Sequence, residues 1–314
     1  MGKLELITGA NNPKKIQYTQ IDTRFDHEEG ISWVLMNPAS VPCFNLGILG
    51  ELQQYNKYIE ESGGEIWADG ELHRVQYTVF ASQVPGVFNL GGQLELFSKL
   101  IRNADREALT HYAKMCIDSM ASRIRHYDLP VVTISLVQGD ALGGGFEAAL
   151  TSDIIIAERS SKMGFPEILF NLFPGMGAYS FLARKVGSIQ AEKIILSGKL
   201  YSAEELHALG LVDVVVDDGH GEEAVYDYVA KQTRRSNGYI GVQKARHRFN
   251  PVTYQELMDI TAIWVDTALN LTEKDLKVMD RFVRSQQKLF DQAAKGNHSL
   301  VESNLQRAPL VMAL

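Results

Sequence analysis

The sequence predicts an α/β fold with an added layer of helices. Short apolar runs rich in β-branched residues alternate with helix-like segments as far as about residue 216. One run, residues 153–158 (DIIIAE), is almost wholly apolar, which is typical of a strand that is buried on both faces of a parallel sheet. From His220 onward the apolar spacing is almost entirely helical. We therefore expect an α/β core followed by a helical subdomain.

The expected strands are short apolar runs bounded by turn residues. They cover residues 31–37, 76–82, 131–137, 153–158 and 211–216. The expected helices have apolar residues every three or four positions, and Ser202 with Glu205 forms a capping-box pattern before one of them. They cover residues 46–62, 95–128 with a break near 103–106, a short stretch after 145, and residues 177–187, 189–198 and 202–210.

The same sequence pattern predicts the domain organisation. We expect a loose lead-in at residues 1–18, an α/β core at 19–218, a helical subdomain at 219–296 and a loose tail at 297–314.

The net charge of −7 gives no general attraction to nucleic acid or to an anionic membrane. No apolar run approaches the roughly 18 residues that span a bilayer.

The cysteine and histidine content predicts a cytoplasmic protein without a metal. Cys43 and Cys116 stand in apolar contexts, which favours buried thiols in a reducing compartment. The first residues lack the apolar segment of a signal peptide, so we expect the protein to be cytoplasmic. The eight histidines show no metal-ligand spacing, and we predict neither a metal nor a tightly bound cofactor.

Three consecutive glycines, residues 143–145, stand between an expected strand and an expected helix. A P-loop would need Lys and Ser or Thr after the last glycine, but Phe146 and Glu147 stand there. The dinucleotide fingerprint and the serine nucleophile elbow are also missing. What remains is a helix N-terminus whose N–H groups face a carbonyl that becomes negative during reaction, which is an oxyanion hole.

Two glutamates in apolar surroundings are candidates for acid–base work. Glu147 begins the helix after the glycines, and Glu167 follows Pro166 in a second apolar stretch. Either carboxylate could simply complement a helix dipole. A close pair of buried carboxyl groups, however, has pKa values that are driven apart, so that one group donates a proton while the other accepts one.

The run from GDALGGGFEAAL through SDIIIAE to MGFPEILFNLFPGMG resembles the crotonase superfamily, and the likeness extends over about residues 131–216. It implies a crotonase-like spiral of ββα units that ends in a C-terminal helical subdomain. It also implies that the thioester carbonyl is bound by the N–H groups of Gly92 and Gly144, and that Glu147 and Glu167 are the catalytic carboxyl groups. A glycine at 144 would leave room for the thioester.

A closer resemblance, over about residues 20–290, is to bacterial diffusible signal factor synthases, through segments such as PGVFNLGGQLELF and ITAIWVDTALNLTEKDL. Two positions depart from that pattern, since Gln93 replaces a usual aspartate and Met163 a common aromatic residue. The resemblance implies dehydration of a 3-hydroxyacyl group on acyl carrier protein to the cis-2-enoyl thioester, followed by hydrolysis to the free acid. We assign Glu167 as the base at carbon 2 and Glu147 as the acid, although the roles can exchange.

Further residues are expected to bind the acyl chain and the carrier protein. The expected wall of the acyl tunnel is apolar and comprises Leu142, Met163, Phe165, Leu169, Met176 and Trp264. A basic cluster suited to an acidic carrier protein comprises Arg234, Arg235, Lys244, Arg246 and Arg248. The resemblance also implies a homo-oligomer, usually a trimer, and possible binding to a sensor protein.

Two other functions fit the same residues. A coenzyme A-dependent enoyl-CoA hydratase or isomerase of fatty acid metabolism would share the glutamates and the oxyanion glycines. A catalytically silent module that binds a sensor protein would not need to keep them, and their presence argues against it.

Overall fold

The computed structural model describes residues 17–294, so most of the expected lead-in and the expected tail lie outside the described residues. A six-stranded sheet has the order β1-β2-β5-β7-β9-β12, a four-stranded sheet has the order β11-β10-β8-β6, and β3 and β4 form a hairpin. The strands are β1 (Ile21–Asp26), β2 (Ile31–Met36), β3 (Glu65–Ala68), β4 (Glu71–Arg74), β5 (Tyr77–Ser82), β6 (Val87–Asn89), β7 (Val132–Val137), β8 (Asp140–Leu142), β9 (Ile154–Glu158), β10 (Lys162–Gly164), β11 (Leu200–Ser202) and β12 (Val214–Val216).

The helices lie between and after these strands, and all the helices expected up to residue 210 are present. Their bounds are α1 (Leu46–Glu61), α2 (Leu94–Arg102), α3 (Arg106–Ile124), η1 (His126–Asp128), α4 (Gly144–Leu150), η2 (Pro166–Phe170), α5 (Ala178–Val186), α6 (Ser188–Ser197), α7 (Ala203–Ala208), α8 (Gly221–Thr233), α9 (Ser236–Phe249), α10 (Tyr254–Leu269) and α11 (Glu273–Ala294). The capping box of Ser202 and Glu205 forms as expected at the start of α7.

A repeating unit generates the two sheets and confirms the predicted fold class. In each unit one strand joins the large sheet, the next joins the small sheet, and a helix follows. The units are β5-β6 before α2, β7-β8 before α4, and β9-β10 before η2 and α5. The large-sheet strands β2, β5, β7 and β9 pair in parallel, which explains why their sequences are nearly continuous apolar runs.

The large sheet separates two parts of the core. On one face Val34 and Phe80 pack among residues of α1 and α3. On the other face Trp33 and Val79 pack against Val225 of α8. Alternate residues of each strand therefore serve different layers, as the pleat of a strand requires.

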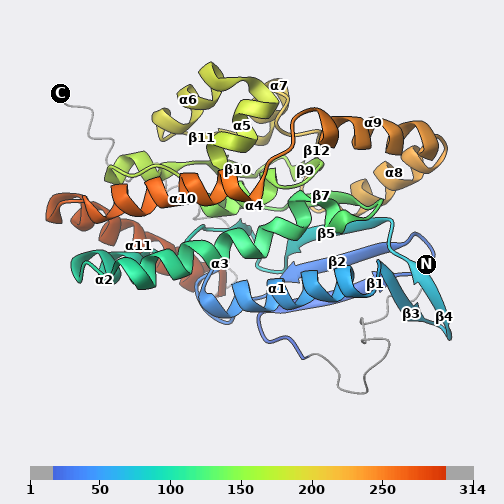
Figure 1. Ribbon diagram of the computed structural model, residues 1–314, viewed down its shortest axis with the longest axis horizontal. Helices are drawn as coiled ribbons and strands as arrows, with labels where there is room; N and C mark the ends of the chain where they lie inside the picture. Colours follow the sequence, from blue (N-terminus) through green and yellow to red (C-terminus); the bar gives the residue numbers. More distant parts are fainter. Residues whose placement is uncertain (1–16, 295–314) are drawn as a thin grey trace.

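The C-terminal helices return to the first half of the chain. Figure 1 shows α10 beside α3 and α11 near α2, and the residue contacts between these pairs agree. None of the helices among residues 17–294 is both long and apolar enough to cross a membrane. The expected division into domains at residue 218 stays a prediction.

Candidate active site

Each of the three glycines has a different surrounding. Gly143 has a φ of +51°, and a Cβ on it would lie 2.2 Å from Oε1 of Glu167. A Cβ on Gly145 would lie 2.1 Å from the carbonyl oxygen of Asn89, which is backbone and cannot move aside. A Cβ on Gly144 would meet nothing nearer than 3.5 Å. Sterics therefore require glycine at 143 and 145, whereas the glycine at 144 needs another explanation.

That explanation is the neighbouring loop at Gly92. One of the atoms 3.5 Å from a Cβ on Gly144 would be the amide nitrogen of Gly92. Both glycines are partly exposed and both line the same cavity, whereas Gly91 and Gly143 beside them are buried. A methyl group on Gly144 would therefore occupy space next to the Gly92 amide that a ligand atom can otherwise enter.

The N–H groups of these two glycines are available. In the loop around Gly92, the N–H of Leu90 donates to the carbonyl of Pro42 at 2.8 Å. The N–H of Gly91 donates to Oδ1 of Asn89 at 2.8 Å. None of the hydrogen bonds found within residues 17–294 uses the N–H of Gly92 or of Gly144. Two unpaired amides at one cavity wall are the donor pair that an oxyanion hole requires.

The C-terminal helix α11 also reaches this loop. Nε2 of Gln286 donates to the carbonyl of Leu90 at 2.8 Å. The loop is therefore held from both its N–H and its C=O side.

Glu147 lies in the first turn of α4 with 2% of its surface exposed. Its Oε1 accepts the N–H groups of Met176 at 2.8 Å and Ala178 at 2.9 Å, at the start of α5. Burial raises the pKa of Glu147 to about 7, while these two N–H groups act in the opposite direction because they favour the ionised form.

Glu167 lies in η2 and lines the same cavity as Glu147. The residue is partly exposed along its length, but its Oε2 atom is buried and has no hydrogen-bond partner. Burial and the charge of Glu147 raise the pKa of Glu167 to about 8. Since Glu147 has two N–H donors, Glu167 is the carboxyl group that holds the proton when the pair carries only one.

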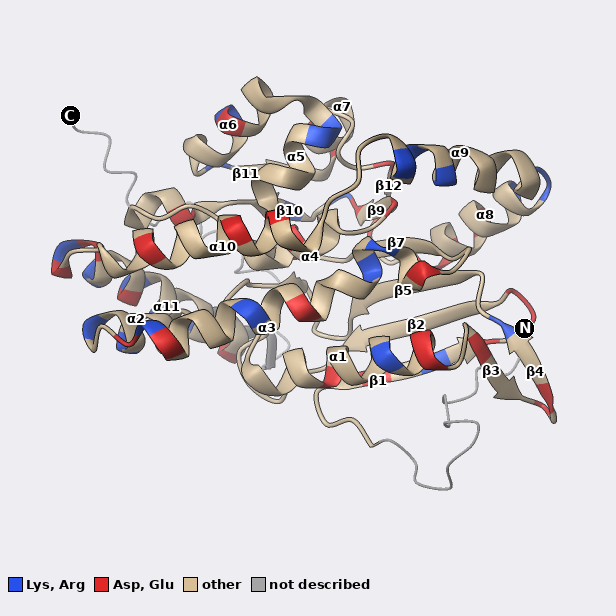
Figure 2. Ribbon diagram, in the orientation of Figure 1, with Lys and Arg blue, Asp and Glu red and all other residues tan. Residues whose placement is uncertain are grey.

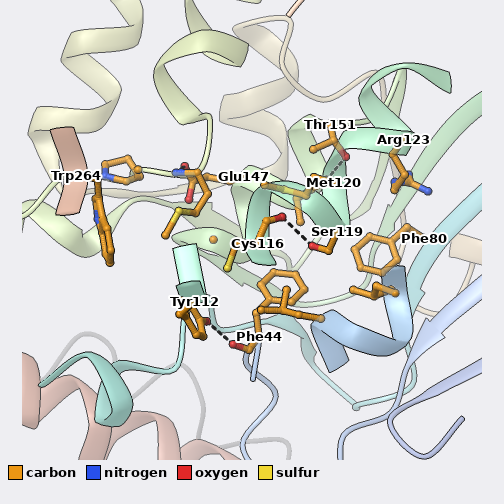
Figure 3. A pocket seen from close by; sticks show the side chains of 18 of the residues that line it. Phe44, Phe80, Tyr112, Cys116, Ser119, Met120, Arg123, Glu147, Thr151 and Trp264 are labelled. Atoms are coloured by element: carbon orange, nitrogen blue, oxygen red, sulfur yellow. Dashed lines mark hydrogen bonds between the residues drawn. The ribbon is translucent and has the colours of Figure 1, made fainter. Parts of the chain in front are cut away.

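The cavity encloses about 850 Å³ including its open mouth, and its lining is mostly apolar and aromatic. Figure 3 shows Glu147 and Trp264 at one side of it and Phe80 and Arg123 at the other. Met176 and Trp264 line the cavity, as the sequence predicts. Trp264 packs so closely on Gly175 that a Cβ there would lie 2.2 Å from the indole.

Four residues expected in the tunnel wall do not line this cavity, and for them the prediction was wrong. Leu142 packs against Val87 and Leu90 in a separate small cluster. Met163 is fully buried in the core because β10 is an inner strand of the small sheet. Phe165 stacks on Phe146, with ring centroids 5.1 Å apart. Leu169 is 54% exposed and lies beside Gly198, the C-cap residue of α6.

The part of the wall that sequence reasoning missed comes largely from α1 and α3. The α3 residues recur every three or four positions, so one helical face of that segment could have been recognised from its spacing. They are Tyr112, Cys116, Ser119, Met120 and Arg123. The polar groups among the lining residues are largely bonded to protein. Tyr127 Oη donates to Asn56 Oδ1 at 3.2 Å, and Asn56 Nδ2 donates to the Ser119 carbonyl at 2.7 Å.

The expected basic cluster lies at α9 and at the turn before it, at the end of the molecule where Figure 2 shows α8 and α9. Arg234, Arg235, Lys244 and Arg248 are exposed. Arg246 differs, because its guanidinium pairs with the buried carboxylate of Asp153. Arg246 therefore has a structural role that the sequence did not reveal.

Two histidines that are far apart in the sequence lie beside the carboxylate of Asp153. Nε2 of His247 lies 2.9 Å from Oδ1 of Asp153, and Nε2 of His126 lies 2.6 Å from that of His247. Three possible metal-ligand atoms therefore converge here, which the scattered histidines of the sequence did not predict. The guanidinium of Arg246 already supplies the opposite charge to the same oxygen, so the cluster is explained as an ion-pair network that holds α9 to the core.

The ββα spiral, the two unpaired amides and the paired carboxyl groups define a protein of the crotonase class. The sequence matches the enoyl-CoA hydratase/isomerase family over residues 72–292. The chain belongs to this family.

Individual relatives agree with this assignment. Methylglutaconyl-CoA hydratase of Rattus norvegicus is 32% identical over 153 residues, which are 49% of this chain and 46% of the relative. The chain spans about half the length of the curated relatives it matches. Among solved structures, enoyl-CoA hydratase of Bacillus halodurans has a TM-score of 0.68 at 20% identity, covering 83% of this chain and 98% of that chain. DspI of Pseudomonas aeruginosa has a TM-score of 0.59 at 24% identity, covering 94% and 97%.

Proposed function

We propose that the protein makes a cis-2-unsaturated fatty acid signal. The substrate would be a 3-hydroxyacyl thioester on acyl carrier protein, which is dehydrated to the cis-2-enoyl thioester and then hydrolysed. The observation that supports this most is the convergence of two unpaired amides, Gly92 and Gly144, with the Glu147–Glu167 pair at one apolar cavity. The resemblance of the sequence to diffusible signal factor synthases supplies the substrate class.

In the dehydration step, the thioester oxygen would accept the N–H groups of Gly92 and Gly144. Removal of a proton from carbon 2 places negative charge on that oxygen, and preorganised donors stabilise it. Dehydration starts from the less populated arrangement of the single proton, with Glu167 ionised and Glu147 protonated. Glu167, as carboxylate, takes the carbon 2 proton, and Glu147, as acid, protonates the hydroxyl that leaves carbon 3 as water. The step therefore ends with Glu147 ionised and Glu167 protonated.

That end state is the one that the two N–H donors at Glu147 favour. It also suits the hydrolysis step. Ionised Glu147 removes a proton from water as it attacks the thioester carbonyl, and protonated Glu167 gives its proton to the departing thiol. The free acid and the carrier thiol are released, and the pair returns to the protonation state in which dehydration begins. The single proton of the pair is therefore on Glu147 before dehydration, on Glu167 after it, and on Glu147 again after hydrolysis.

The cavity supports an acyl substrate because its lining is mostly apolar and extends from Trp264 of α10 on one side to Phe80 of β5 on the other (Figure 3). We propose that the carrier protein docks on the exposed basic residues Arg234, Arg235, Lys244 and Arg248. An acidic partner needs such a local surface, because the chain itself has a net charge of −7.

The experiment is a direct product assay. Purified protein is incubated with 3-hydroxyacyl carrier protein of several chain lengths, and the released acids are identified by mass spectrometry. Free cis-2 acid, lost in Glu147→Gln and Glu167→Gln, is the expected result. Intact thioester, or a trans product only, would contradict the proposal.

A second candidate is a coenzyme A-dependent enoyl-CoA hydratase, and the family match together with the hydratases among the relatives favours it. The same preparation is given trans-2-enoyl-CoA. Rapid reversible hydration without thioester cleavage would favour this second function.

A further inference from the structure

Tyr112 of α3 contacts the loop that carries Gly92 without belonging to it. Its hydroxyl accepts the N–H of Gln93 at 3.2 Å and donates to the carbonyl of Phe44, a bond that Figure 3 marks. The N–H of Phe44 in turn donates to the carbonyl of Gly91 at 2.8 Å. The hydroxyl of Tyr112 therefore connects the peptides on both sides of Gly92.

The peptide between Gly91 and Gly92 is the one that matters for an oxyanion hole. Its C=O and N–H point in opposite directions, because a peptide bond is planar and trans. When Phe44 binds the carbonyl of Gly91, the N–H of Gly92 is directed the opposite way. Glycine itself restricts its backbone least of all residues, so hydrogen bonds from neighbours must fix this orientation.

The ring of Tyr112 supports the same loop by packing. It is 1% exposed and meets Phe97 edge to face, with centroids 4.8 Å apart. Phe97 occupies the space where a Cβ of Gly92 would be, at 2.6 Å. Burial raises the pKa of Tyr112 well above its usual value, so the phenol keeps the proton that it donates to Phe44.

We propose that Tyr112 is a positioning residue that directs the N–H of Gly92 at the thioester oxygen, acting through Phe44 and Gln93. The inference rests on the proposed function, because it assumes that Gly92 is an oxyanion donor. It adds a residue whose hydroxyl is bonded to the loop and to Phe44, and which acts on the carbonyl through the direction of the Gly92 N–H.

Tyr112→Phe keeps the ring and its packing but removes the hydroxyl. The matched control is Tyr228→Phe in α8, which removes a hydroxyl that is bonded to Tyr239 at 2.9 Å and does not line the cavity. We expect kcat of Tyr112→Phe to fall about 10- to 100-fold while KM changes less than about threefold, because a misdirected donor costs somewhat less than a missing one. Tyr228→Phe should change neither.

The second measurement is the carbonyl stretching band of an isotopically labelled acyl thioester bound to the protein. It is recorded in the Glu147→Gln background, so that no turnover occurs. In that background the band should be shifted from its position in solution, and Tyr112→Phe should move it back. An unchanged band, or a loss confined to KM or to thermal stability, would overturn the inference. Absence of any product from the unaltered protein would instead count against the proposed function, while the band would still report on Tyr112.

Discussion

A Cβ on Gly144 would lie 3.5 Å from the amide nitrogen of Gly92, although the two glycines come from different ββα units. This is ordinary van der Waals contact, so alanine fits at position 144 without displacing the fold. The same methyl group would stand beside the Gly92 N–H, where a bound carbonyl oxygen would approach in the proposed oxyanion hole. We therefore expect the fold to accept alanine at position 144, whereas the proposed reaction should not.

Gly144→Ala is accordingly expected to fold normally and to lose activity. Loss of access to one oxyanion donor costs ~3 kcal/mol, or roughly 100- to 1,000-fold in kcat. Thermal unfolding should stay close to that of the unaltered protein. Gly50→Ala in α1 is the control, because nothing lies within 4 Å of its Cβ position. Full activity in Gly144→Ala would remove the main support for the oxyanion hole.

Replacement of either glutamate by glutamine should abolish most of the reaction. We expect kcat to fall roughly 100- to 10,000-fold in each single variant, because general acid–base catalysis contributes on that scale. The double variant should be little worse than either single one, since the two groups act as a unit. Glu158→Gln is a matched control: this glutamate is also buried, but it bonds Gln138 and Gly221 away from the cavity. A single variant that retains product by mass spectrometry would contradict the assignment.

Activity should depend on pH as a bell-shaped curve, because the reaction needs one proton on the pair. At low pH both Glu147 and Glu167 are protonated, and at high pH both are ionised. Burial raises the pKa of Glu147 to about 7 and that of Glu167, with the charge of Glu147, to about 8, so the optimum should lie near neutrality. Steady-state kinetics with saturating substrate between pH 5 and 9.5 would test this; a flat profile would exclude the pair as acid and base.

The same raised pKa predicts a stability change. Between the ordinary pKa of 4.5 and about 8, the folded protein binds the Glu167 proton more tightly than the unfolded chain does. This contribution to the free energy of unfolding is therefore complete below pH 4.5 and is lost as the pH rises through about 8. Glu167→Gln should raise the melting temperature more at pH 8.5 than at pH 5. Glu71→Gln, exposed on β4, should show no such difference. An equal effect of Glu167→Gln at both pH values would show that the carboxyl group is not held neutral.

Charge reversal should reveal the carrier-docking surface. Arg234→Glu with Arg235→Glu is expected to raise KM for the carrier-bound substrate at least tenfold at low salt, with little effect on a small thioester. Arg246 is left unchanged because it pairs with Asp153. Equal changes for both substrates would dismiss docking at α9.

The sequence was a good guide wherever a local pattern carries the information. The apolar runs predicted five strands of the large sheet, and Ser202 with Glu205 predicted the start of α7. The resemblance to the crotonase superfamily placed two glycines and two glutamates at one site. All four line the same cavity: Gly92, Gly144, Glu147 and Glu167. Three-residue strands such as β8 and β10 were not predicted, because so short a run shows no alternation of apolar and polar residues.

The tunnel wall was predicted poorly for a physical reason. Phe165 and Met163 are as apolar as Met176, and only the three-dimensional packing decides which of them faces the cavity and which fills the core. Tyr112 could have been placed on one face of α3, but its bonds to Phe44 and Gln93 link segments that sequence spacing does not relate.

The bond from Gln286 to the carbonyl of Leu90 has a consequence for how the chain can be shortened. A truncation that ends before residue 286 would keep both carboxyl groups and every described residue of the cavity wall, yet would remove one hydrogen bond that holds the loop carrying Gly92. Deletions of this segment should therefore be judged by activity as well as by folding, because the cavity wall can stay whole while the neighbouring loop loses a hydrogen bond that orders it.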